Sequence, residues 1–159
     1  MKEPVVYLSG GKELLDQVRP LWEKLNVYHR QHATHFADQF DRLTFDVRKQ
    51  KFLSDEAIKV RVDLVKGKKD NECVGYCVST ISDGNMGEID SLYVESEYRQ
   101  YGIGDRLMRL SLSWFDEHQV QQRMIGVAEG NEGQFRFYDR YGFYPRKTML
   151  EQIQVKSKT

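Results

Sequence analysis

The sequence predicts an α/β protein, with a central mixed sheet that carries helices on both faces. Segments that alternate apolar and polar residues, as strands do, are interspersed with segments whose apolar residues recur at helical spacing. Three strands follow one another through short turns, as antiparallel hairpins do, and a later helix suits a parallel crossover. The length of 159 residues predicts a single domain, 1-159, with one hydrophobic core.

The first part of the chain combines one short strand with two helices. Residues 4–9 form a β-rich run, which we expect at a sheet edge because a proline stands at its start. Residues 12–31 carry apolar side chains at helical spacing, and Pro20 inside this pattern predicts a kink or a restart of the helix. A second helix is expected over residues 34–49, with Thr34 as its N-terminal cap.

The remaining elements alternate more regularly between strands and helices. Short charged or glycine-bearing loops separate the first three strands, and a glycine follows the last helix, where helices commonly end. The predicted order is strand 58–65, strand 73–81, a strand ending at Val94, helix 102–118, strand 123–129, helix 132–141 and a last strand 148–155.

The composition argues against several classes of protein. Lys plus Arg and Asp plus Glu both number 24, so charge-driven binding to nucleic acid or to an anionic membrane is not expected. No apolar run approaches the roughly 18 residues of a membrane span, and the N-terminal apolar run is too short for a signal peptide. Cys73 and Cys77 would lie about 13 Å apart on one strand, too far for a disulfide. Free thiols predict a reducing, cytoplasmic location.

A glycine-bearing turn joins a strand to a helix in the stretch MGEIDSLYVESEYRQYGIGDRLM. The first turn of a helix has unpaired N–H groups at its positive end, and Gly102 and Gly104 would let an anion approach them. Arg99 adds a fixed positive charge, so the stretch predicts a phosphate or pyrophosphate site, with an ordinary tight turn as the alternative. Leu107 replaces the third glycine of the dinucleotide fingerprint, and no Gly-Lys-Ser/Thr follows.

A second informative stretch reads GVAEGNEGQFRFYDRYGFYP. Together the two stretches resemble the GNAT superfamily of acyl-CoA-dependent N-acyltransferases. The first matches the family's Arg/Gln-x-x-Gly-x-Gly/Ala loop as Arg99, Gly102 and Gly104. The second matches its strand–Asn–helix segment, with Asn131 followed by the pattern Phe-Tyr-x-x-x-Gly-Phe. The resemblance covers about residues 59–155 and implies the family's fold, in which a splayed pair of parallel strands holds the cofactor arm.

The resemblance implies transfer of an acetyl group from acetyl-CoA, a co-substrate, to a primary amine by direct attack and without a metal. Tyr138 matches the family's general acid, because a phenol with a pKa near 10 can protonate a departing thiolate; a core aromatic is the alternative. Glu88, eleven residues before Arg99, matches the base of the histone-acetyltransferase branch, and a water chain is the alternative. The implied cofactor-binding residues are Leu92, Tyr93, Val94, Arg99, Gln100, Tyr101, Gly102, Ile103, Gly104, Asp105, Asn131 and Tyr138.

The amine acceptor is the part that the sequence determines least. The resemblance implies that residues 28–45, which carry aromatic and acidic side chains, line the acceptor site. The acceptor could be a small molecule or a peptide, and the C-terminal strand is a plausible contact for a homodimer. His29, His32 and His35 drift around a helix by about 60° per step, so a metal site is not predicted. A non-catalytic acyl-CoA sensor or partner-binding module is the alternative function; an unrelated phosphate-binding domain is a third.

Overall fold

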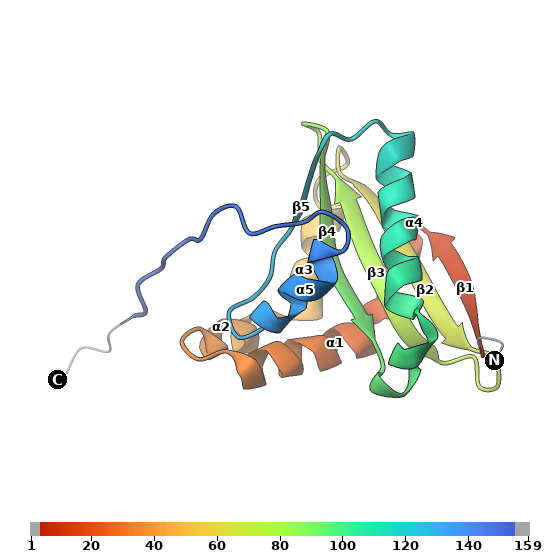
Figure 1. The fold of residues 1–159 in the computed structure, drawn as a ribbon, viewed down its shortest axis with the longest axis horizontal. Helices are drawn as coiled ribbons and strands as arrows, with labels where there is room; N and C mark the ends of the chain where they lie inside the picture. The colour runs from red at the N-terminus through yellow and green to blue at the C-terminus, as the bar shows by residue number, and fades with distance from the viewer. Residues whose placement is uncertain (1–3, 155–159) are drawn as a thin grey trace.

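The computed structural model describes residues 4–154, which form one five-stranded mixed sheet flanked by helices (Figure 1). The strand order is that of the chain; the first four strands are antiparallel, and the fifth runs parallel to the fourth. The predicted fold class is thereby confirmed. The strands are β1 (Val5–Gly10), β2 (Lys59–Gly67), β3 (Cys73–Ile81), β4 (Met86–Val94) and β5 (Gln122–Ile125).

Three helices precede β2, and one crossover helix joins the parallel pair β4 and β5. No helix within residues 4–154 is long and apolar enough to cross a membrane. The α-helices are α1 (Leu15–His32), α2 (Ala37–Arg42), α3 (Phe45–Leu53), α4 (Ile103–Glu117) and α5 (Phe135–Asp139). Short 3₁₀ turns are η1 (Lys12–Leu14), η2 (Ser96–Tyr101) and η3 (Glu132–Gln134).

The N-terminal helices differ from the sequence prediction. Pro20 lies inside α1, which continues through it, so the predicted alternative of a restart there is wrong. The single helix predicted over residues 34–49 is also wrong, because Leu43 and Thr44 are extended and separate α2 from α3. Thr44 is the effective cap: its hydroxyl oxygen accepts a hydrogen bond of 3.2 Å from the backbone N–H of Val47.

The predicted last strand is absent from the part of it that the structure describes. Residues 148–154 adopt no regular structure and extend away from the sheet (Figure 1), and position 155 lies outside the described range. Met149 and Leu150 are 80% and 91% exposed. An alternating sequence becomes a strand only when a sheet edge pairs with its backbone and buries its apolar side, and here no such pairing occurs.

The sheet carries a separate hydrophobic core on each face. On one face α4 packs against the sheet, and Ile103, Leu107 and Phe115 are completely buried there. On the other face α1 and α3 cover the sheet, with Leu15 and Phe45 at the contact. Each of these helices therefore removes its apolar side from water by packing it against the strands.

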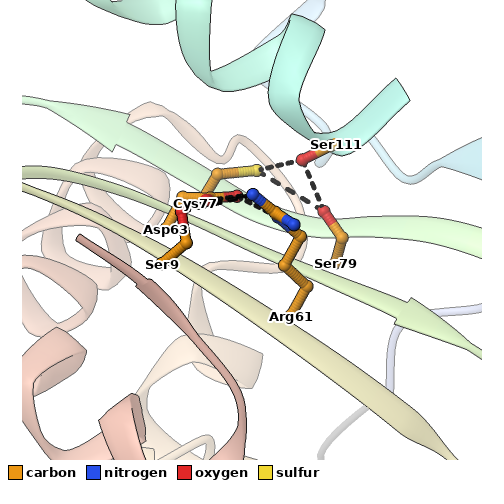
Figure 2. A network of polar contacts seen from close by, with 6 residues as sticks. All are labelled: Ser9, Arg61, Asp63, Cys77, Ser79 and Ser111. Carbon is orange, nitrogen blue, oxygen red and sulfur yellow. Dashed lines mark hydrogen bonds and ion pairs between the residues drawn. The ribbon is translucent and has the colours of Figure 1, made fainter. Parts of the chain in front are cut away.

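Two groups of polar contacts tie neighbouring elements together (Figure 2): Ser9, Arg61 and Asp63 join β1 to β2, and Cys77, Ser79 and Ser111 join β3 to α4. Arg61 donates two hydrogen bonds of 2.9 Å to Asp63, which is 1% exposed and needs such a partner to carry its charge. The hydroxyl groups of Ser79 and Ser111 are 2.7 Å apart and tie β3 to α4. Beside them burial raises the pKa of the Cys77 thiol to about 12, so this thiol is neutral. The Ser111 contacts attach the middle of α4 to β3, and the first turn of α4 borders the site described next.

Candidate active site

The parallel strands β4 and β5 separate after a short paired region. Their register ends at Ile89 and Ile125, whereas β4 continues to its last residue, Val94. A cavity of about 380 Å³ opens beyond this point, and the last three residues of β4, Leu92 to Val94, form one of its walls. That edge of β4 therefore faces the cavity instead of a neighbouring strand, so its backbone groups are available to a ligand.

A β-bulge in β4 lies where the two strands separate. Ile89 and Ser91 pair with consecutive residues of β3, so Asp90 is an extra residue in the ladder. The bulge shifts the alternation of side chains: Ile89 and, three residues later, Leu92 both pack in the core under α4. Asp90 is directed by this bulge into the wall of the cavity.

The glycine turn forms a second wall at the first turn of α4. Gly102 has φ of 71°, a left-handed conformation that favours glycine, and contributes no capping side chain. A Cβ on Gly104 would lie 3.4 Å from the Phe137 ring, so the backbone stays bare where it meets the cavity. Arg99 donates a hydrogen bond of 2.9 Å from Nε to the carbonyl of Val94, which holds the turn against the end of β4.

The charges around this turn favour an anion. Asp105 places a carboxylate in the first turn of α4, but Tyr141 donates a hydrogen bond to it and Arg109 donates another at 3.0 Å. These hydrogen bonds, the one from Tyr141 foremost, lower the pKa of Asp105. Arg140, 3.8 Å from the carboxylate, and Arg99 also line the cavity, so at this turn two arginines accompany the one carboxylate of Asp105.

Residues around α5 close the third side of the cavity. Asn131 precedes η3, but its side chain makes no capping hydrogen bond there, so it does not act as a helix cap. It lines the cavity, as does Tyr138. Burial raises the pKa of Tyr138 to about 12, so the phenol keeps its proton through the neutral range. Tyr138 also packs against the core under α4, so it has a packing role beside any chemical one.

The structure brings most of the predicted site residues together. Those that line the cavity are Leu92, Tyr93, Val94, Arg99, Gly102, Gly104, Asp105, Asn131 and Tyr138. The side chains that do not line it are those of Glu88, Gln100, Tyr101 and Ile103. Ile103 is completely buried in the core under α4, as an apolar residue in the first turn of an amphipathic helix should be.

Several polar residues line this cavity that were not among the predicted site residues, including His29 from α1 and Asp90 from the bulge. Burial lowers the pKa of His29, and its Nδ1 atom is buried without a partner in the described part of the chain. The Asp90 side chain is 3% exposed, and burial raises its pKa. Both residues also line a smaller adjoining cavity of about 150 Å³, where Arg48 of α3 approaches Asp90.

The fold and this site define a class of protein: a mixed α/β sheet whose open strand pair and bare helix start border a polar cavity. Comparison with known families identifies it further. The Acetyltransferase (GNAT) family matches residues 16–143, and the chain belongs to this family.

Individual relatives are more distant. A mycothiol acetyltransferase from Acidimicrobium ferrooxidans is 29% identical over 80 residues, which are 48% of this chain and 26% of that protein, so the chain spans about a quarter of that relative. A GCN5-related N-acetyltransferase from Ralstonia eutropha JMP134 has a TM-score of 0.70 at 17% identity, over 94% of this chain and 98% of that one. The AAC(6')-Iy structure, in complex with a bisubstrate CoA analogue, has a TM-score of 0.63 at 12% identity, over 95% and 99%.

Proposed function

We propose that this chain transfers an acetyl group from acetyl-CoA to a primary amine, which attacks the thioester directly. The observation that carries the proposal is the cavity between β4 and β5, which the glycine turn, the open edge of β4 and Tyr138 border together. Membership of an acetyltransferase family supports the reaction type. The CoA analogue bound to AAC(6')-Iy, a protein of similar fold, supports the choice of coenzyme.

The residues present fit such a coenzyme. Acetyl-CoA supplies an activated acyl group as a thioester, joined through an extended arm to a pyrophosphate. Arg99, Gly102 and Gly104 would hold the pyrophosphate, because the bare first turn of α4 and the nearby guanidinium favour an anion. The open edge of β4 at residues 92–94 would pair with the arm, and Asn131 would contact it from the opposite side. The backbone groups of Gln100, Tyr101 and Ile103 belong to the same turn, and their roles stay predictions.

Tyr138 is proposed as the general acid. It lines the cavity, and its raised pKa of about 12 keeps a proton on the phenol for a departing thiolate. As the new N–C bond forms and the C–S bond breaks, Tyr138 donates its proton to sulfur. The nitrogen loses two protons in all: the base takes one and releases it to solvent, and the other replaces the proton that Tyr138 has donated.

The base is proposed to be a carboxylate of β4. Glu88 is the candidate that the sequence favours, but its side chain does not line the cavity. Asp90 does line it, is buried, and has a pKa raised by that burial, which makes its carboxylate more basic. Asp90 is therefore the stronger candidate to take a proton from the attacking ammonium group.

The alternative function is an acyl-CoA sensor or partner-binding module without turnover. The two functions differ in whether free thiol appears when an amine is added. The decisive experiment is calorimetric titration with acetyl-CoA, CoA and ADP, followed by a thiol-release assay over a panel of amines, amino acids and peptides. Binding with thiol release supports the enzyme, binding without release on any acceptor supports the sensor, and absence of binding overturns both.

Two further expectations accompany the proposal. A cytoplasmic location is proposed on the sequence argument about free thiols, and Cys73 and Cys77 are both unpaired in the structure.

A homodimer is proposed through the C-terminal residues 148–154, whose exposed apolar side chains would be buried against a second copy. Sedimentation equilibrium of the full chain, compared with a chain ending at Lys147, tests this contact.

A further inference from the structure

The smaller cavity has a composition that differs from that of the coenzyme cavity beside it. It encloses about 150 Å³ between α1, α2, α3 and the bulge of β4. Part of its wall is apolar and comes from Trp22, Leu25, Phe40 and Leu43, while Asp90 and Arg48 bring opposite charges into the same wall. A cavity with one apolar side and both charge signs suits a ligand that itself carries an ammonium, a carboxylate and an apolar group.

The charged pair in this wall is loosely made. Arg48 Nη1 lies 3.4 Å from the nearer carboxylate oxygen of Asp90, well beyond the roughly 2.7–2.9 Å of a charge-assisted hydrogen bond. The Nε atom of Arg48 is buried and has no hydrogen-bond partner within the described residues. A buried donor atom without a partner is costly unless something occupies it, so the Nε of Arg48 is a place for an anionic ligand group.

The two cavities share residues and therefore communicate. Asp90, His29 and Leu25 line both of them, whereas Arg48 and the aromatic residues line only the smaller one. An amine at Asp90 would stand at the boundary, facing the open edge of β4 and Tyr138. A carboxylate on the adjacent carbon would then reach Arg48, and alternating charges would join ligand and protein in one array.

We propose that the acceptor is a free α-amino acid with an apolar side chain, its ammonium at Asp90, its carboxylate at Arg48 and its side chain against Trp22 and Phe40. This inference rests on the proposed function, since it names the acceptor of the same acetyl transfer. Arg48 is the specificity-determining residue, because an arginine fork recognises a carboxylate in two-pronged fashion and a lysine does not.

Matched acceptor pairs test the inference directly. L-Leucine and 3-methylbutylamine, or L-phenylalanine and 2-phenylethylamine, differ only by the carboxylate. We expect kcat/KM to be at least about tenfold higher for the amino acid of each pair. Arg48→Lys keeps a charge near Asp90 but loses the fork, and should reduce kcat/KM for the amino acid by about 10–100-fold with less than about a threefold change for the amine. Arg42→Gln, an exposed arginine that does not line the cavity, is the matched control.

The outcomes separate the inference from the function on which it rests. Equal turnover of both members of each pair, or equal losses for both in Arg48→Lys, overturns the amino-acid acceptor while acetyl transfer stands. If acetyl-CoA binds but no amine is acetylated, the proposed transfer falls. In that case the inference is judged by titrating the CoA complex with L-leucine: binding that Arg48→Lys weakens keeps the amino-acid site, and no binding overturns it.

Discussion

The carboxylate of Glu129 accepts a hydrogen bond of 2.6 Å from the backbone N–H of Phe36, 93 positions earlier in the chain. The same oxygen accepts a second bond of 2.6 Å from the N–H of His35, and the other oxygen lies 3.0 Å from the His35 ring. Glu129 thus joins the segment after β5 to the turn between α1 and α2. The smaller cavity is lined by His29 and Phe40 on one side of this contact in the chain and by Gly126 and Ala128 on the other, so the contact ties together segments next to its walls.

The first prediction concerns Gly130, the residue after Glu129. Its φ is 89°, and a Cβ there would lie 2.0 Å from the carbonyl oxygen of His32, so no side chain fits. Gly130→Ala should lower the free energy of unfolding by about 2 kcal/mol or more, measured by urea denaturation, and raise KM for the acceptor. Gly133→Ala is the control in the same segment, because its Cβ would meet nothing within 4 Å. Equal stability of the two variants would contradict the close approach.

The second prediction concerns the acid dependence of the Glu129 contact. Desolvation opposes ionisation, but the hydrogen bonds from His35 and Phe36 outweigh it and lower the pKa of Glu129 from its ordinary value of 4.5. A lowered folded-state pKa contributes stability that is present above about pH 4.5 and lost as the pH falls through the folded-state value. Wild type should be more stable than Glu129→Gln at neutral pH, and the difference should shrink below pH 4.5. A difference that is constant from pH 7 to pH 3 would assign no role to the charge.

The third prediction separates the chemical role of Tyr138 from its packing role. Tyr138→Phe keeps the ring but removes the proton, so kcat should fall by about 10²–10⁴-fold while the Kd for acetyl-CoA stays within about twofold. Steady-state kinetics measures kcat, and calorimetry measures the Kd for acetyl-CoA. Tyr144→Phe is the control, since Tyr144 is 69% exposed. Equal losses in kcat and coenzyme affinity would assign Tyr138 to packing alone.

The fourth prediction tests the phosphate site at the start of α4. Gly104→Glu should abolish coenzyme binding, because the new side chain crowds Phe137 and its charge repels phosphate. Gly84→Glu introduces the same charge in the exposed β3–β4 turn, where the nearest atom to a new Cβ is 3.9 Å away, and should bind acetyl-CoA normally. Normal affinity in Gly104→Glu would remove the assignment of this turn to the phosphates.

The fifth prediction distinguishes the two carboxylates of β4. Asp90→Asn should lower kcat by about 10²–10⁴-fold and remove the acidic limb of the pH–rate profile, because Asp90 lines the cavity. Glu88→Gln should change kcat by less than about threefold. A large decrease in kcat for Glu88→Gln and a small one for Asp90→Asn would restore Glu88 as the base. Small decreases in kcat for both variants would favour a water chain.

The glycine turn and the segment around Asn131 and Tyr138 could be predicted from the sequence, because each depends on residues close together in the chain. A left-handed glycine, a bare helix start and an arginine three residues earlier are local features, and they occupy the predicted positions at Arg99, Gly102 and Gly104. The prediction of the last strand failed. Residues 148–154 have a suitable alternation of apolar and polar side chains, but they pair with no edge of the sheet.

Only the tertiary structure decided which polar groups meet. The bulge at Asp90 arises from the register between β3 and β4, and alternation in β4 alone does not indicate it. Arg48 approaches Asp90, and His29 lines the same cavities, because α1 and α3 pack against the same face of the sheet, at sequence distances over which no periodicity operates. The sequence alone therefore determined the family, the glycine turn and the candidate acid. The cavities and their charges were decided by long-range packing, since burial and charge pairing exist only once distant segments are in contact.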